Sequence, residues 1–194
     1  MIAGKLGKPD RSKYWREEAS RIRAETIEKS WNEKLNTFSD TWGGDDVDSC
    51  LLLLAELGFI EAKDPRYIGT VEAIEKKLRH GDHLFRYAKA DDFGVPETAF
   101  NICTFWFISA LAKIGRQDEA KSMFENILKC RNSIGLLSED IDTDATDKGP
   151  EMLWGNYPQT YSLVGIIDCA IQLSAPWCTS TACEDSSETC SQLK

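Results

Sequence analysis

The sequence lacks a surplus of positive charge, and this absence narrows the range of partners. Its 194 residues include 23 Lys and Arg against 32 Asp and Glu, so the formal net charge is −9. Binding to a nucleic-acid backbone requires a basic face that neutralises phosphates, and basic amphipathic helices bind anionic membrane surfaces. The composition therefore argues against nucleic acid and against a membrane as the main partner.

Long apolar runs are also absent. The best candidate, Cys50 to Leu54, is far shorter than the roughly 20 residues that a transmembrane helix needs. The first eight residues, Met1 to Lys8, contain no apolar core of the kind that a signal peptide has. We therefore expect a cytoplasmic protein.

The cysteines form no recognisable metal-binding pattern. The four that fall within predicted helices, where Cys behaves as a small buried hydrophobe, are Cys50, Cys103, Cys130 and Cys169. The other three, Cys178, Cys183 and Cys190, lie in a polar tail at spacings that match no zinc or iron–sulfur motif. We expect reduced thiols, no metal and no cofactor. A disulfide between two tail cysteines is the alternative if the tail meets an oxidising compartment.

Apolar residues recur at helical spacing in six segments. The first expected helix begins at Ser12 and ends before a loop at 36–44. The other five are expected at about 46–58, 65–79, 97–115, 117–130 and 159–174. The start of the third is the best marked, because Asp64 suits the N-cap and Pro65 suits the first helical position.

These helices alternate between amphipathic and almost wholly apolar, which predicts an all-α fold. The apolar ones begin near residues 46, 97 and 159, so the pair repeats every 50 to 60 residues. An α/α toroid of inner and outer helices fits this alternation over residues 11–175, although three hairpins form only an arc. A tetratricopeptide-type solenoid is the alternative, but its repeats are shorter. Residues 1–10 are expected to be flexible, and the Cys/Ser/Thr-rich tail at 176–194 is expected to be disordered.

A long connection separates the last two expected helices. It contains the segment 135–142 and, after a gap, the segment 155–159. Connections of this length are uncommon in compact domains and are often functional. Within it, Glu139 follows a short apolar run from Ile134 to Leu137, which can fix the backbone while the carboxylate points into a cavity. The alternative is a solvated acidic loop that also includes Asp140, Asp142, Asp144 and Asp147.

A series of short motifs occurs in an order similar to that of one enzyme family. They are Asp48 before a Leu run, Asp64-Pro65-Arg66, 70–74, Arg86-Tyr87, 97–100, Cys103 with Phe105-Trp106, 135–142 and 155–159. Together they span roughly residues 30 to 175. The chain resembles the C-terminal half of the catalytic domain of glycoside hydrolase family 15, the glucoamylase-like and bacterial trehalase-like enzymes.

The resemblance implies a fold, a reaction and residue roles. The fold would be about half of an (α/α)6 barrel, and the reaction would be hydrolysis of an α-glucan or α-glucoside oligosaccharide with inversion. Glu139 falls on the family's general base and Arg86 on an arginine that contacts sugar hydroxyls. Phe100 and Trp106 fall in a segment with aromatic residues beside the sugar. Glu97, at a predicted helix start next to a loop, is a further candidate for a substrate contact.

Each of these residues also has a structural interpretation. Arg86 could be a surface ion-pair partner. Phe100 and Trp106 have the character of core residues, and Glu97 suits the N-terminus of a helix because of the helix dipole.

The sequence departs from the family pattern in three places. No counterpart of the family's general acid is found, since that acid lies in an upstream segment. Thr98 replaces a frequent Gly, Leu163 replaces a frequent His, and the cysteine-rich tail has no counterpart. The two hypotheses are therefore an incomplete glycosidase and a non-catalytic half-barrel that binds glycan or a partner chain. An open arc would expose inner helices, so we expect self-association or a complementing chain.

Overall fold

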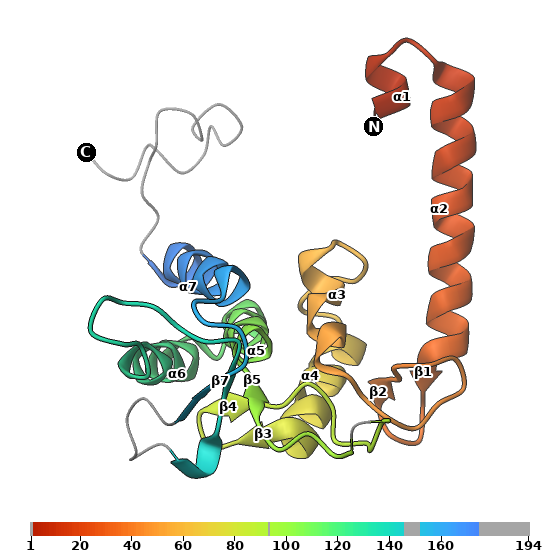
Figure 1. Cartoon of the computed structure of the whole chain (residues 1–194). Helices are drawn as coiled ribbons and strands as arrows, with labels where there is room; N and C mark the ends of the chain where they lie inside the picture. Colours follow the sequence, from red (N-terminus) through yellow and green to blue (C-terminus); the bar gives the residue numbers. More distant parts are fainter. Residues whose placement is uncertain (1, 93, 146–151, 175–194) are drawn as a thin grey trace.

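The computed structural model describes residues 2–92, 94–145 and 152–174 (Figure 1). Its α-helices are α1 (Ile2–Lys5), α2 (Pro9–Ser30), α3 (Leu53–Glu56), α4 (Pro65–Leu78), α5 (Asn101–Ile114), α6 (Gln117–Lys129) and α7 (Thr160–Leu173). Two 3-10 helices, η1 (Ser49–Leu52) and η2 (Thr143–Ala145), complete the helical elements. The prediction of a mainly helical chain is confirmed. None of the described helices is both long and apolar enough to cross a membrane.

Local sequence signals place the ends of the central helices correctly. The Asp64 carboxylate accepts a hydrogen bond of 2.9 Å from the Arg66 amide, which caps α4 as predicted. Gly115, at a φ of 101°, ends α5 in the left-handed conformation that favours glycine. The boundaries of α4 and α6 agree with the predicted ranges to within one residue.

The prediction of one continuous buried helix at 46–58 is wrong. The segment is divided into η1 and α3, because Asp48 caps a tight turn by accepting a 2.8 Å hydrogen bond from the Cys50 amide. Leu52 is buried, but Leu57 is 76% exposed. Gly58, with a positive φ, ends the segment as expected.

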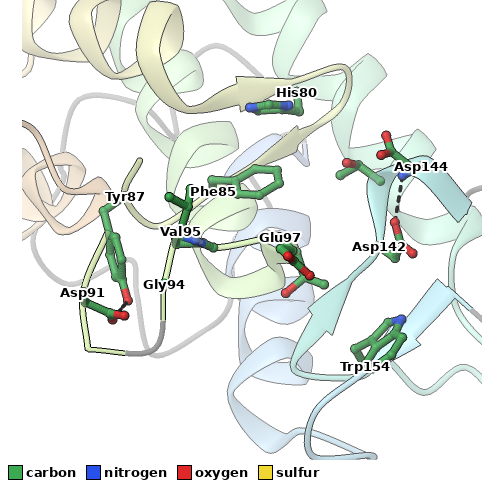
Figure 2. A pocket seen from close by; sticks show the side chains of 13 residues that line it. His80, Phe85, Tyr87, Asp91, Gly94, Val95, Glu97, Asp142, Asp144 and Trp154 are labelled. Atoms are coloured by element: carbon green, nitrogen blue, oxygen red, sulfur yellow. Dashed lines mark hydrogen bonds between the residues drawn. The ribbon is translucent and has the colours of Figure 1, made fainter. Parts of the chain in front are cut away.

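Short antiparallel strands, absent from the prediction, hold the loops together. The pairs β1 (Trp31–Asn32) with β2 (Thr37–Phe38) and β3 (Arg79–His80) with β4 (His83–Leu84) are hairpins. A three-stranded sheet has the order β5 (Ala99–Phe100), β6 (Asp140–Ile141) and β7 (Leu153–Trp154). In Figure 2, Trp154 of β7 and Asp142, which follows β6, lie on the same side of the view. Since β5 takes Ala99 and Phe100, α5 begins later than the predicted residue 97.

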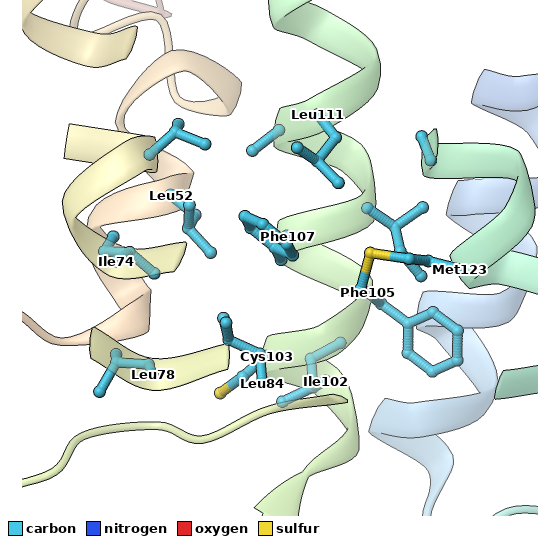
Figure 3. Packing of buried hydrophobic residues seen from close by; sticks show 14 of the residues in the cluster. Leu52, Ile74, Leu78, Leu84, Ile102, Cys103, Phe105, Phe107, Leu111 and Met123 are labelled. Atoms are coloured by element: carbon cyan, nitrogen blue, oxygen red, sulfur yellow. The ribbon is translucent and has the colours of Figure 1, made fainter. Parts of the chain in front are cut away.

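The core surrounds α5, whose burial was predicted. Figure 3 shows Phe107 and Leu111 of α5 facing the elements that carry Leu52 and Ile74, and Met123 lies beside α5. All five side chains are at most 3% exposed. The helix is thus covered on several sides and fixes the positions of the loops at its N-terminus.

The helices near the two ends of the described chain are much less buried. In Figure 1, α2 stands clear of the rest of the molecule, and its only buried residues are Ser12 and Ser30. The predicted burial of the last helix is wrong for one face of α7, where Tyr161, Val164 and Ile167 are exposed. No described element covers that face. The first ten residues include α1, while the predicted tail and its cysteines lie outside the described residues.

Candidate active site

The main chain at Glu139 is fixed by elements that lie far away in the sequence. Its amide donates to the carbonyl of Asn156 (2.9 Å), and its carbonyl accepts from the amide of Asn101 at the start of α5 (3.0 Å). The preceding carbonyl, of buried Ser138, accepts from Asn101 Nδ2 (2.9 Å) and Ser162 Oγ (2.8 Å). The first turns of α5 and α7 therefore hold the peptide that presents Glu139.

The carboxylate of Glu139 is held through one oxygen. Oε2 accepts hydrogen bonds from the Asn156 amide (3.1 Å) and from Asn156 Nδ2 (2.7 Å). Within the described residues, Oε1 accepts no hydrogen bond from the protein. One oxygen is thus oriented, and the other is available to a water molecule or a ligand.

Gly155 makes this close approach of Asn156 feasible. Its φ is +75°, and a Cβ there would lie 2.9 Å from Glu139 Cβ and 3.0 Å from Glu139 Oε2. A side chain at this position would therefore collide with Glu139 and would also occupy an unfavourable backbone conformation.

Arg86 and Phe100 line the same small pocket as Glu139. The pocket has a volume of about 210 Å³, and its other lining residues are Tyr87, Pro96, Thr98 and Asp140. Arg86 Nε lies 3.4 Å from Asp48 Oδ2, with the arginine side chain 55% exposed. Its guanidinium carbon lies 5.9 Å from the centre of the Tyr87 ring. Arg86 can therefore form the ion pair with Asp48 and still line the pocket of Glu139.

Asp140 adds a second carboxyl group at this pocket. In the three-stranded sheet, Asp140 of the central strand β6 lies opposite Phe100 of β5 and opposite Trp154 of β7. Burial, assisted by the neighbouring charge of Glu139, raises the pKa of Asp140 to about 6. Asp140 thus changes charge within the pH range in which many enzymes work.

Glu97 lies in an adjoining and larger pocket of about 920 Å³. Figure 2 shows it between Tyr87, whose hydroxyl donates to Asp91, and Asp142 on the opposite wall. The two pockets share Tyr87, Pro96 and Thr98 as lining residues. A ligand longer than one sugar ring could therefore extend from the pocket of Glu139 to that of Glu97.

Trp106 lies elsewhere. It lines a groove of about 370 Å³ between α3, α5 and α7, which shares no lining residue with the pocket of Glu139. Its ring meets that of Tyr161 edge to face, with 6.0 Å between ring centres. The structure thus brings together Glu139, Arg86 and Phe100, places Glu97 next to them and places Trp106 apart, while the roles of all five stay predictions.

Two residues of this arrangement were not assigned a role from the sequence. Asn156 belongs to the motif at 155–159, and Asp48 precedes the Leu run, so both positions had been singled out. Their partners, Glu139 and Arg86, lie 17 and 38 residues away in the chain. No local pattern in the sequence shows such contacts.

The cysteines and acidic residues offer no metal site in the part of the chain that is described. No three of its His, Cys, Asp and Glu residues are grouped so as to hold a metal ion. Burial raises the pKa of Cys103 and of Cys169 to about 12, so both thiols stay protonated at neutral pH. The predicted burial is confirmed for these two cysteines and is wrong for Cys50, which is exposed.

Comparisons with known proteins agree on one family. The family described as "Glycosyl hydrolases family 15" matches residues 1–171. The trehalase of Thermoplasma volcanium is 35% identical over 173 residues, which cover 89% of this chain and 27% of that protein. For the trehalase of Thermoplasma acidophilum the identity is 36%, and the coverage is 89% and 29%. The chain thus spans less than a third of the length of these relatives.

Solved structures support the fold. A wild-type glycosidase superposes with a TM-score of 0.67 at 19% identity, over 81% of this chain and 43% of that chain. A variant glycosidase in complex with glucose gives the same TM-score of 0.67 at 20% identity, again over 81% and 43%.

Proposed function

The chain belongs to glycosyl hydrolases family 15, and from this premise we propose that it forms the general-base side of a site that hydrolyses α-glucosidic bonds with inversion. Its fold would be about half of an (α/α)6 barrel. The substrate class would be α-glucosides, with trehalose the first candidate because several similar proteins are named trehalases. Longer α-glucans, the substrates of glucoamylase-like enzymes, are the competing candidates.

The observation that carries this proposal is the orientation of Glu139. Asn156 binds Oε2 through two hydrogen bonds, and Oε1 is left for a water molecule. In an inverting glycosidase, the base removes a proton from water as that water attacks the anomeric carbon. A carboxylate with one fixed oxygen can hold this water in a defined position.

The other two lining residues suit a sugar ring. The guanidinium of Arg86 offers several N–H donors to hydroxyl groups, and Asp48 limits its movement. The aromatic face of Phe100 can pack on the C–H surface of the ring. The volume of about 210 Å³ is that of a small pocket, and the adjoining pocket would take the second glucose unit of trehalose.

The general acid must come from elsewhere. Inverting glycosidases place the acid about 6.5–9.5 Å from the base, on the opposite side of the scissile bond. We found no counterpart of the family's acid in the sequence. Hydrolysis therefore requires a segment, in the same or in another polypeptide, that brings an acidic side chain to the pocket of Glu139.

The experiment that tests this function compares the chain alone with a chimera. In the chimera, the matching 173-residue segment of the Thermoplasma volcanium trehalase is exchanged for the corresponding part of this chain. Glucose release is measured with trehalose, maltose, maltotetraose and isomaltose. We expect the chimera to hydrolyse trehalose fastest and the chain alone to release little or no glucose.

One result would contradict the proposal: a folded chimera without activity on any of the four sugars would show that this segment cannot supply the base. If trehalose stabilised that inactive chimera and Arg86→Ala removed the stabilisation, the non-catalytic glycan-binding alternative would be supported. Faster hydrolysis of maltotetraose than of trehalose would move the substrate class to α-glucans.

A further inference from the structure

The three-stranded sheet β5–β6–β7 has one face in the core and one face toward the candidate site. Residues that lie opposite each other on neighbouring antiparallel strands place their side chains on the same face of a sheet. One such row consists of Ala99, Ile141 and Leu153. The first two of these side chains are fully buried, and the third packs against the core. The other row consists of Phe100, Asp140 and Trp154, which therefore point away from the core.

This outward row connects the two pockets of the candidate site. Phe100 and Asp140 line the pocket of Glu139, and Trp154 lines the pocket of Glu97. Phe100 and Trp154 are separated by two strand spacings, which amount to about 10 Å. Two linked pyranose rings fit over this distance. A disaccharide whose first ring packs on Phe100 therefore reaches Trp154 with its second ring.

Trp154 combines an open aromatic face with a fixed backbone. Its side chain is 55% exposed, and aromatic faces pack well on the C–H surface of a sugar. Strand β7 ends at Trp154, and Asn156, two residues later, binds the carboxylate of Glu139. One short segment therefore fixes both the tryptophan and the carboxylate that acts as the base.

Asp142 supplies a hydrogen-bond acceptor in the same pocket. Its Oδ1 accepts from the amide of Asp144 (2.9 Å), and its own amide donates to the carbonyl of Met152 (2.9 Å). Within the described residues, Oδ2 accepts no hydrogen bond from the protein. Figure 2 shows Asp142 and Trp154 on the same side of the pocket. The aromatic face can thus pack on the C–H surface of a sugar while the carboxylate oxygen accepts from a hydroxyl group.

We propose that Trp154 packs on the second sugar of the substrate and makes the site selective for glucosides whose leaving group is itself a sugar. Asp142 orients this second sugar through one of its hydroxyl groups. Since the first sugar must lie in the pocket of Glu139, this specificity rests on the function proposed above.

The test compares two substrates, trehalose and α-glucosyl fluoride, in the trehalase chimera. Both place a glucose unit in the pocket of Glu139, but the leaving group of the fluoride is a single atom and does not reach Trp154. We expect Trp154→Ala to lower kcat/KM on trehalose about 10-fold, because one aromatic packing contact is lost, and to leave kcat/KM on the fluoride unchanged. Trp154→Phe keeps an aromatic ring and should stay within about threefold of the wild type on both substrates.

Trp42→Ala is the matched control, because Trp42 is 60% exposed and lines neither pocket. It should change kcat/KM on neither substrate. For Trp154→Ala, an unchanged rate on trehalose would overturn the proposal. Equal losses on both substrates would also overturn it and would indicate a structural role, which the thermal unfolding midpoint of the variant checks. An inactive wild-type chimera would overturn the proposed function and this specificity together, whereas an active chimera without the selective loss would overturn the specificity alone.

Discussion

Glu139 and Glu97 both belong to short sequence motifs, but their surroundings in the structure differ. The amide, the carbonyl and the carboxylate of Glu139 are each hydrogen-bonded to Asn101 or Asn156. Glu97 is exposed, and its carboxylate makes no hydrogen bond in the part of the chain that is described. Proximity to a motif therefore does not decide how firmly a carboxylate is held: hydrogen bonds fix the position of Glu139, and none fixes that of Glu97 within the described residues.

The largest expected effect is that of Glu139→Gln in the trehalase chimera. Loss of the general base should lower kcat on trehalose by about 10²–10⁴-fold, because the amide cannot accept the proton of the attacking water. Glucose release at saturating trehalose measures this. The matched control, Glu97→Gln, should change kcat by less than about threefold. Equal losses in the two variants would remove the distinction between the two carboxylates.

Asn156→Ala should have the next largest effect. Removal of the side-chain donor leaves Glu139 Oε2 with the Asn156 amide alone. Since small errors in the position of a catalytic group are costly, we expect kcat to fall about 10- to 100-fold. KM should change little, because Asn156 is not among the residues that line the pocket. A rise in KM at constant kcat would instead indicate that Asn156 contacts the substrate.

Gly155→Ala and Gly135→Ala form a pair that isolates the contact with Glu139. Both glycines have a positive φ, so each substitution should destabilise the fold by about 1 kcal/mol. Only at Gly155 would the new Cβ collide with Glu139, since nothing lies within 4 Å at Gly135. We therefore expect Gly155→Ala to lower kcat several-fold in the chimera and Gly135→Ala to leave it unchanged. Similar rates for both would show that Glu139 tolerates displacement.

Asp140→Asn should affect stability and its dependence on pH. Burial and Glu139 raise the pKa of Asp140 to about 6, so the folded state binds the proton more tightly than the unfolded state does. Above pH 6 the ionised Asp140 destabilises the fold, and below about pH 4 this penalty is absent. Because Asp140 is partly solvated, we expect Asp140→Asn to raise the free energy of unfolding by about 1–2 kcal/mol at pH 7.5.

Urea denaturation at pH 7.5 and at pH 4 measures this effect. Asp144→Asn, at an exposed position nearby, is the control and should change stability at neither pH. A gain of equal size at both pH values would show that the effect does not arise from the charge of Asp140.

Helices with strong local signals could be predicted from the sequence, while elements that depend on distant contacts could not. Asp64 and Gly115 mark the start of α4 and the end of α5. The strands β5 and β6 pair residues about 40 positions apart and are two residues long, too short to show a period. Hydrophobicity along α7 indicates which side chains favour burial, but it does not show whether another element covers them.

The same limit applies to the candidate site. The motif at 135–142 pointed to Glu139, and the structure places Arg86 and Phe100 at the same pocket. Trp106 lies apart because it is a residue of α5 that lines the groove with α3 and α7, whereas Phe100 belongs to β5 and lines the pocket of Glu139. The hydrogen bonds from Asn156 to Glu139 depend on the close approach of two loops, which the sequence does not encode in any local spacing.

The stereochemistry of trehalose hydrolysis tests the central claim most directly. Attack by a water held at Glu139 inverts the attacked anomeric carbon, so each trehalose should first yield one β-glucose and one α-glucose. Proton NMR of the chimera reaction within the first minutes distinguishes these anomers before mutarotation. We predict equal amounts of both, and no early β-glucose with Glu139→Gln. Early α-glucose alone, or β-glucose formation that persists in Glu139→Gln, would contradict the assignment of Glu139 as the base.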